Sequence, residues 1–100
     1  MADDLASLWK EQQVAPFPQG SMGLRTGGRP LLKLDVAVGA ILTGCLRSDG
    51  IPRPLPVEKR SELAECRAEL ERALADLPLD PESRAYFSRL ELLAAAILKG

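Results

Sequence analysis

Four groups of side chains in this 100-residue sequence have types and spacings that could do chemistry. The first is a glycine-rich stretch with basic residues beside it, a composition that could cradle a phosphate. The glycines are Gly20, Gly23, Gly27 and Gly28, and the basic residues are Arg25, Arg29 and Lys33. Their spacing matches neither the dinucleotide-binding fingerprint nor the Walker loop. We therefore interpret these glycines as turn residues.

The second group is the pair of cysteines, Cys45 and Cys66. Both fall on apolar faces of predicted helices, where a thiol behaves as a small hydrophobe with a raised pKa. The sequence predicts two buried free thiols. A disulfide, which would need the two Cα atoms within about 4.4 to 6.8 Å, and a redox role are the alternatives.

The third group is an acidic series at intervals of four, three and four residues: Glu58, Glu62, Glu65 and Glu69. Carboxylates on one helical face could bind a cation or act as a general acid and base. The interleaved Arg and Lys residues indicate a solvated face instead. The chain has no histidine, which excludes an imidazole base and a histidine metal ligand. We predict no catalytic residue, no metal site, no cofactor and a non-enzymatic protein.

The fourth group is basic and lies in the middle of the chain, where residues 25–60 carry seven basic and three acidic residues. The candidate surface for an anion or a partner consists of Arg25, Arg29, Lys33, Arg47 and Arg53. The net charge of the whole chain is only −1, and no recognition helix with base-reading side chains is evident. Nucleic-acid binding is therefore the weaker hypothesis for this surface.

The element expected to organise the chain is the stretch DVAVGAILTGCLRSDG at 35–50, which carries no charge over residues 36–46. Asp35 is suited to an N-cap, so we predict a helix over 36–47 that is buried on all sides. A glycine inside a helix costs roughly 1 kcal/mol relative to alanine. We therefore expect another helix or backbone segment to approach closely at Gly39 and Gly44.

Apolar periodicity predicts three further helices, over 3–14, 57–77 and 81–98. Leu5, Leu8 and Trp9 of the first should dock on the core. The last helix begins at the N-cap Asp80 and forms an antiparallel pair with the helix before it. Its apolar arc, widened by Leu92, is either deeply buried or used in self-association.

The linking segments are rich in proline and glycine. The pieces MGLRT and PLLKL on either side of Gly27-Gly28 predict a small hairpin with Pro30 at an edge. Phe17, between two prolines, should close one end of the helical core. Residues 48–57 predict an extended connector, for which a polyproline ligand at 53–56 is the less favoured interpretation.

A group of features along the chain resembles small uncharacterised actinobacterial proteins. The features are Trp9 before a P-F-P turn, the glycine-punctuated hairpin, L-D at 34–35 opening an A/V/G helix, Cys66 on the next helix, and Y-F-x-R-L at 86–90. The resemblance implies a bacterial, cytoplasmic protein and no particular activity, cofactor or partner.

The sequence as a whole predicts a mainly α, single-domain helical bundle over residues 1–100, with about four helices and a small β-hairpin between the first and second. Neither a signal peptide nor a transmembrane run is evident, so we expect a cytoplasmic protein without membrane contact. We predict a non-enzymatic protein-interaction module that binds a protein partner or itself as a homodimer. The alternative is a small regulatory nucleic-acid-binding protein that uses the basic middle segment.

Overall fold

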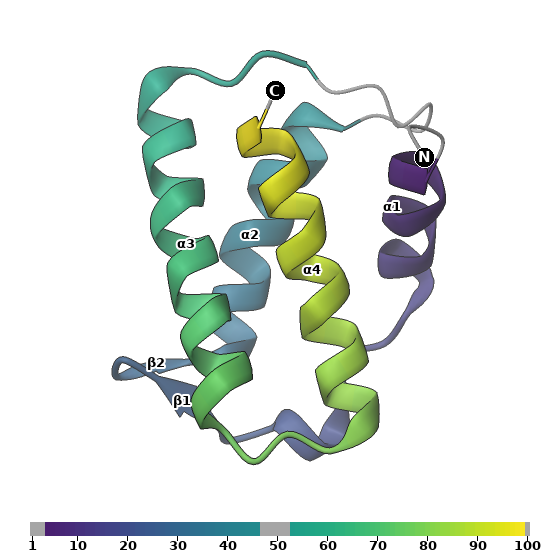
Figure 1. The fold of residues 1–100 in the computed structure, drawn as a ribbon, viewed down its shortest axis with the longest axis vertical. Coiled ribbons are helices and arrows are strands. Elements are labelled where there is room, and N and C mark those ends of the chain that lie inside the picture. Colours follow the sequence, from purple (N-terminus) through teal and green to yellow (C-terminus); the bar gives the residue numbers. More distant parts are fainter. Residues whose placement is uncertain (1–3, 47–52, 100) are drawn as a thin grey trace.

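The computed structural model describes residues 4–46 and 53–99, and within them the predicted helical bundle with its hairpin is confirmed. The elements in chain order are α1 (Asp4–Val14), the 3-10 helix η1 (Gln19–Ser21), β1 (Arg25–Thr26), β2 (Arg29–Pro30), α2 (Leu31–Cys45), α3 (Val57–Asp76) and α4 (Pro81–Lys99). Successive α-helices run in opposite directions (Figure 1). Helices α2, α3 and α4 pack together, and α1 packs mainly on the other side of α4.

The two longest helices form as their apolar spacing predicts. Leu63, Cys66, Leu70 and Ala73 are the buried residues of α3. Helix α4 begins after Asp80, whose Oδ1 accepts a hydrogen bond of 2.8 Å from the Ser83 N–H. Hydrogen bonding from Ser83 holds the pKa of the Asp80 carboxyl below its usual value. The predicted cap and the antiparallel helix pair are thus confirmed.

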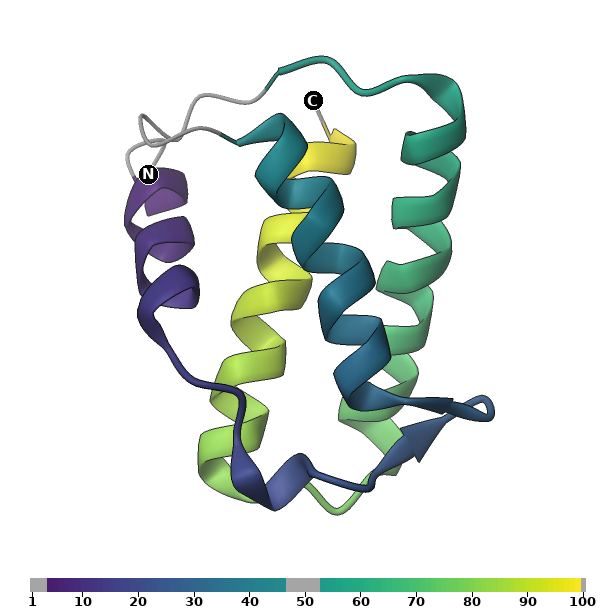
Figure 2. The same cartoon turned by 180° about the vertical axis from the view of Figure 1, so that it is seen from behind.

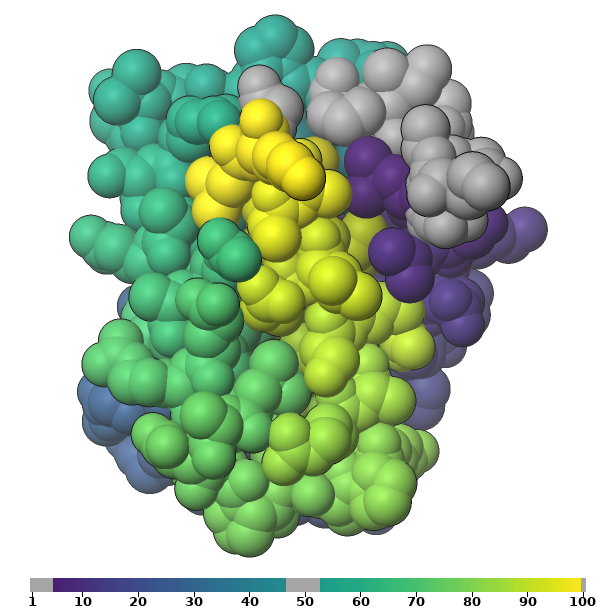
Figure 3. Space-filling model, viewed as in Figure 1, coloured from purple at the N-terminus to yellow at the C-terminus, as the bar shows by residue number. Residues whose placement is uncertain are grey.

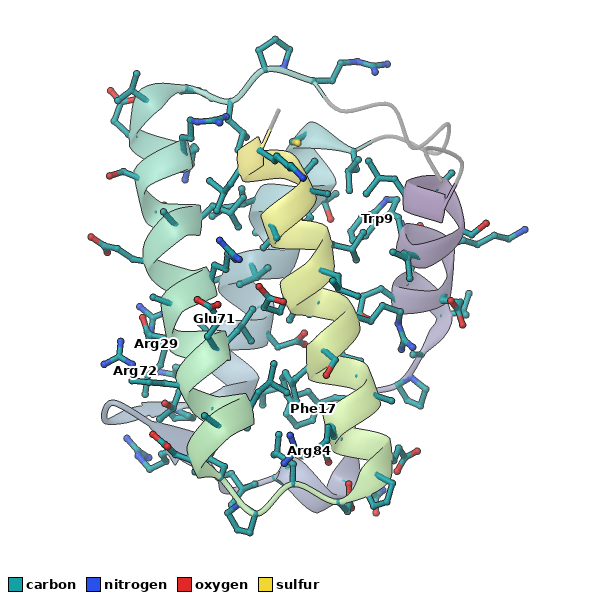
Figure 4. The ribbon with its side chains drawn as sticks, in the orientation of Figure 1. Trp9, Phe17, Arg29, Glu71, Arg72 and Arg84 are labelled. Carbon is teal, nitrogen blue, oxygen red and sulfur yellow. The ribbon has the colours of Figure 1, made fainter. Side chains whose placement is uncertain are left out.

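Aromatic rings close one end of the core, as expected from the position of Phe17 between prolines. The Phe17 ring meets the rings of Tyr86 and Phe87 edge-on, with centroids 6.0 and 5.8 Å apart. Figure 4 shows Phe17 pointing into the bundle at the end where η1 lies, and Trp9 pointing from α1 toward α4. Trp9 is buried, so the predicted docking of α1 is also confirmed.

The hairpin is smaller than the sequence suggested. Gly27 and Gly28 both have positive φ, 57° and 80°, as the turn between two paired strands requires. Within the hairpin, Arg25–Thr26 pairs with Arg29–Pro30 in antiparallel directions. The prediction of a strand over PLLKL was wrong because Leu31 and Leu34, three residues apart, lie on the buried side of a helix.

Helix α2 therefore starts at Leu31, five residues earlier than predicted, with Pro30 at the N-cap position. The assignment of Asp35 as the N-cap was wrong, since Asp35 lies in the second turn. The inner side of α2 is buried against the rest of the core. Its buried residues are Leu31, Leu34, Val38, Ile41, Leu42 and Cys45.

The outer side of α2 faces away from the bundle (Figure 2), which corrects the prediction of a helix enclosed on all sides. A Cβ atom placed on Gly39 or Gly44 would meet no described atom within 4 Å other than those of its chain neighbours and its own helix backbone. The predicted close approach at these glycines was therefore wrong. Gly20 is different, because a Cβ there would collide with the Asp80 side chain.

Residues 53–56 of the connector form neither helix nor strand, and the Arg53 N–H donates a hydrogen bond of 2.8 Å to the Cys45 carbonyl.

Within the described ranges, every helix is too short or too polar to cross a lipid bilayer.

Opposite stability changes are expected at Gly39 and Gly20. Gly39→Ala should raise the free energy of unfolding by about 0.5 to 1 kcal/mol, because the new methyl group has open space and alanine favours the helix. Gly20→Ala should lower it, because Asp80 would have to leave its cap position. Urea denaturation measures both, and a loss of stability in Gly39→Ala would contradict the open outer side of α2.

Candidate functional site

An apolar surface runs along the outer side of α2. It consists of Leu32, Val36, Ala40 and Gly44, which recur every four residues and are all exposed; we call it the α2 face. Val36 is 62% exposed and Leu32 is 44% exposed. Residues four apart lie on neighbouring turns of a helix, each rotated by about 40° from the last, so the face winds around α2 through about 120° from Leu32 to Gly44.

A hollow adjoins the C-terminal half of the α2 face, and we call it the connector hollow. It measures about 270 Å³ and lies between α2, the connector and the start of α3. Its walls are formed by Ala37, Ala40, Ile41, Gly44, Pro54, Leu55, Pro56, Lys59 and Glu62. Only Lys59 and Glu62 are charged, and Lys59 Nζ lies 3.5 Å from Glu62 Oε1. The hollow is therefore an apolar extension of the face.

The apolar arc of α4, expected to be either buried or used in self-association, is mostly buried. Its buried residues include Tyr86, Phe87, Leu90, Leu93 and Ile97. Figure 3 shows side chains of α3 and α1 packed along both sides of α4. Of the large apolar residues on α4, Leu92 is the exposed one, at 53%. The residues that widen the arc, Leu92, Ala95 and Ala96, are exposed or half-buried, so the arc is used only in part within the chain.

The four described members of the predicted basic surface are not brought together. Arg25, Arg29 and Lys33 lie at the hairpin end of the bundle, whereas Arg53 lies in the connector at the opposite end (Figure 1). Arg47 falls outside the described residues. Arg25 Nη2 donates to the Gly28 carbonyl at 2.8 Å. Nucleic-acid binding stays a prediction, and retention on a heparin column at low salt is its test.

Arg29 also lines a groove of about 440 Å³ between the hairpin and α3. The other residues of this groove are Gly27, Glu65, Ala68, Glu69 and Arg72. Figure 4 shows Arg29 and Arg72 extending side by side past α3. Arg29 Nε lies 3.8 Å from Glu69 Oε1. With two acidic and two basic side chains, the groove has no net charge to attract an anion, which agrees with reading the glycines here as turn residues.

The two cysteines are free and buried, as predicted. Burial raises the pKa of the Cys66 thiol, and the guanidinium of Arg29, with Nη1 3.8 Å from the sulfur, only partly opposes this rise. A thiol with a raised pKa and a covered sulfur is a poor nucleophile.

The acidic series on α3 is mostly a solvated face. Glu58, Glu62 and Glu65 are exposed, and Glu69 is half-buried beside Arg29. Among the described residues, no group of three or more acidic or cysteine side chains is placed to hold a metal ion.

A polar cluster between α1, α2 and α4 was not predicted from the sequence. The Tyr86 hydroxyl donates a hydrogen bond of 2.9 Å to Asp35 Oδ1, and Arg89 Nε donates one of 2.8 Å to Gln12 Oε1. Burial raises the pKa of the Asp35 carboxyl, and the Tyr86 hydrogen bond opposes that rise. Burial and the nearby Asp35 charge both raise the pKa of Tyr86. The sequence signal that could have indicated this cluster was the presence of Asp35 and Tyr86 among the apolar residues of two predicted helices.

Comparison with known protein families, curated proteins and solved structures gives no match. The resemblance to actinobacterial proteins therefore stays a prediction. The functional interpretation depends on the chain's own residues, above all on the α2 face and the connector hollow.

The Asp35 carboxyl should make stability depend on pH in a defined direction. The folded state holds the Asp35 proton to a higher pH than the unfolded chain does, so this group's contribution to stability falls as pH rises above its ordinary pKa of 3.8. Asp35→Asn removes the charge and keeps an oxygen that can accept from Tyr86. We expect the stability of Asp35→Asn relative to wild type to be higher at pH 7 than at pH 3, as measured by urea denaturation.

Tyr86→Phe is the matched comparison for that experiment. It removes the donor and leaves the carboxylate in place, so it should lower the free energy of unfolding at pH 7 by about 1.5 to 3 kcal/mol. If Asp35→Asn were less stable relative to wild type at pH 7 than at pH 3, the direction assigned to the Asp35 pKa would be wrong.

Proposed function

We propose that this protein is a non-enzymatic interaction module that associates with a second copy of itself through the α2 face. The observation that carries the proposal is the series of exposed apolar residues on α2, beside which Lys33 and Thr43 are also exposed. Leu32 and Val36 lie one helical turn apart, and the surface continues through Ala40 to Gly44 and the connector hollow. No charged residue occurs between Asp35 and Arg47 in the sequence.

The other exposed large apolar residues do not form such a surface. Val14, Met22, Val57 and Leu92 lie on different elements, and single exposed apolar residues are normal in a monomer. A contiguous apolar face along a whole helix is typical of a surface that a partner covers. Covering it is favourable because apolar surface removed from water contributes about 25 cal/mol per Å².

Self-association is favoured over a different partner because the α2 face can satisfy a symmetric contact. In a two-fold dimer the same patch occurs on both copies and must be complementary to itself. The face combines protruding side chains, Leu32 and Val36, with the flat positions Ala40 and Gly44. The face therefore supplies both the protruding side chains and the flat positions that a symmetric contact requires.

A charge placed on the α2 face should prevent association. Val36→Glu would bury a carboxylate in an apolar contact, which is unfavourable without a partner for the charge. We expect wild-type protein to rise in mass toward that of a dimer with increasing concentration, as measured by size-exclusion chromatography with light scattering. Val36→Glu should remain a monomer across the same range.

Leu92→Glu is the matched control, because Leu92 is exposed to a similar degree on α4. It should dimerise as wild type does. Wild-type protein that stays monomeric at high concentration would contradict the proposal. If Leu92→Glu prevented dimerisation and Val36→Glu did not, the contact would lie on α4 and not on the α2 face.

A further inference from the structure

We infer that the two α2 helices pair in antiparallel directions, so that Leu32 and Val36 of each copy face Gly44 and Ala40 of the other. This inference rests on the proposed self-association and specifies its geometry. It follows from two independent properties of α2: the order of large and small residues along the face, and the charges at the ends of the helix.

The large and small residues of the α2 face are separated along the helix. Its N-terminal half carries Leu32 and Val36, and its C-terminal half carries Ala40 and Gly44. In a parallel pair, large residues would meet large ones and leave a gap between the small ones. An antiparallel pair sets each large side chain against a small position. Shape complementarity of this kind is what a stable interface requires.

The connector hollow lies where the antiparallel pair needs space. If Val36 faces Ala40 of the second copy, Leu32 lies one turn further along, over Gly44. Gly44 is part of the wall of the connector hollow, together with Ile41 and Leu55. Outside its chain neighbours and the α2 backbone, no described atom lies within 4 Å of the Cβ position of Gly44, so an incoming leucine side chain meets open space and an apolar wall.

Electrostatics favours the same direction. The first turn of α2 has no acidic residue and its last turn has no basic residue. Lys33 stands instead in the first turn, beside the positive end of its own helix, and is exposed. In an antiparallel pair, Lys33 lies beside the last turn of the other α2, where a positive charge is favourable. A parallel pair would bring the two Lys33 side chains together.

Disulfide trapping distinguishes the two directions. Val36→Cys and Ala40→Cys are prepared separately, mixed in equal amounts and oxidised with diamide, and the linked species are identified by intact mass. Both positions are exposed, and circular dichroism confirms that each variant is folded. The antiparallel pair places residue 36 opposite residue 40, so the mixed disulfide should exceed half of all linked dimers, which is the statistical share. Wild-type protein is the control, since its two cysteines are buried.

The outcomes separate this inference from the proposed function. In the antiparallel pair, the two copies of residue 36 are offset by one turn, about 5 to 6 Å. Predominant 36–36 and 40–40 disulfides would therefore indicate a parallel pair and overturn the inference, while association through the α2 face would stand. A wild-type dimer that yields no linked species at either position would also overturn it. If the wild-type protein stayed monomeric and the cysteine variants formed no disulfide-linked dimers, both this inference and the proposed function would be overturned.

Lys33→Glu gives a second, independent test. An acidic residue in the first turn suits the dipole of its own helix, so the isolated monomer should be at least as stable as wild type. In the antiparallel dimer the same change places two carboxylates beside helix C-termini, and the dissociation constant should rise on the order of three- to tenfold. An unchanged or lowered dissociation constant would contradict the antiparallel pair. A Lys33→Glu monomer that is less stable than wild type would contradict the placement of Lys33 beside the positive end of the α2 dipole.

Discussion

The remaining architecture depends on the packing of the inner side of α2 against α3 and α4. Leu31, Leu34, Val38 and Leu42 are completely buried there. Burial of large aliphatic side chains contributes about 1.5 to 3 kcal/mol each, so this contact outweighs any surface ion pair of the molecule. It also sets the rotation of α2 about its axis. Once the inner residues are covered, the positions four residues apart on the opposite side must face outward.

The position of α1 decides which helix has the most helical neighbours. Helix α1 docks on α4, where Trp9 is buried and Arg89 binds Gln12. Helix α4 thereby contacts α1, α2 and α3, while α2 packs mainly on α3 and α4, and both helices keep an exposed side (Figures 1 and 2). The uncharged helix predicted to be the centre of the core is partly a surface helix, and α4 has more helical neighbours than α2 has. The order of packing, and not the hydrophobicity of each helix, produces this difference.

Periodicity and turn chemistry were sufficient to predict much of the fold. The helices α1, α3 and α4, the Asp80 cap and the Gly27-Gly28 turn are all local features of the sequence. The start of α2 was missed because the short apolar run after Pro30 fits a strand and a helix equally well. The Tyr86–Asp35 hydrogen bond joins residues 51 apart in sequence, and it depends on how two helices are rotated. The α2 face could not be predicted for the same reason, since apolar residues cover every side of that segment.

Coverage of the outer side of α2 by a second copy is tested most directly by ¹H–¹⁵N correlation spectra of the wild-type protein over a range of concentrations. We expect shift changes that saturate with concentration and are confined to backbone amides of α2 and of the neighbouring connector, around Leu55. Spectra that do not change with concentration, or changes centred on Leu92 and the outer side of α4, would contradict it.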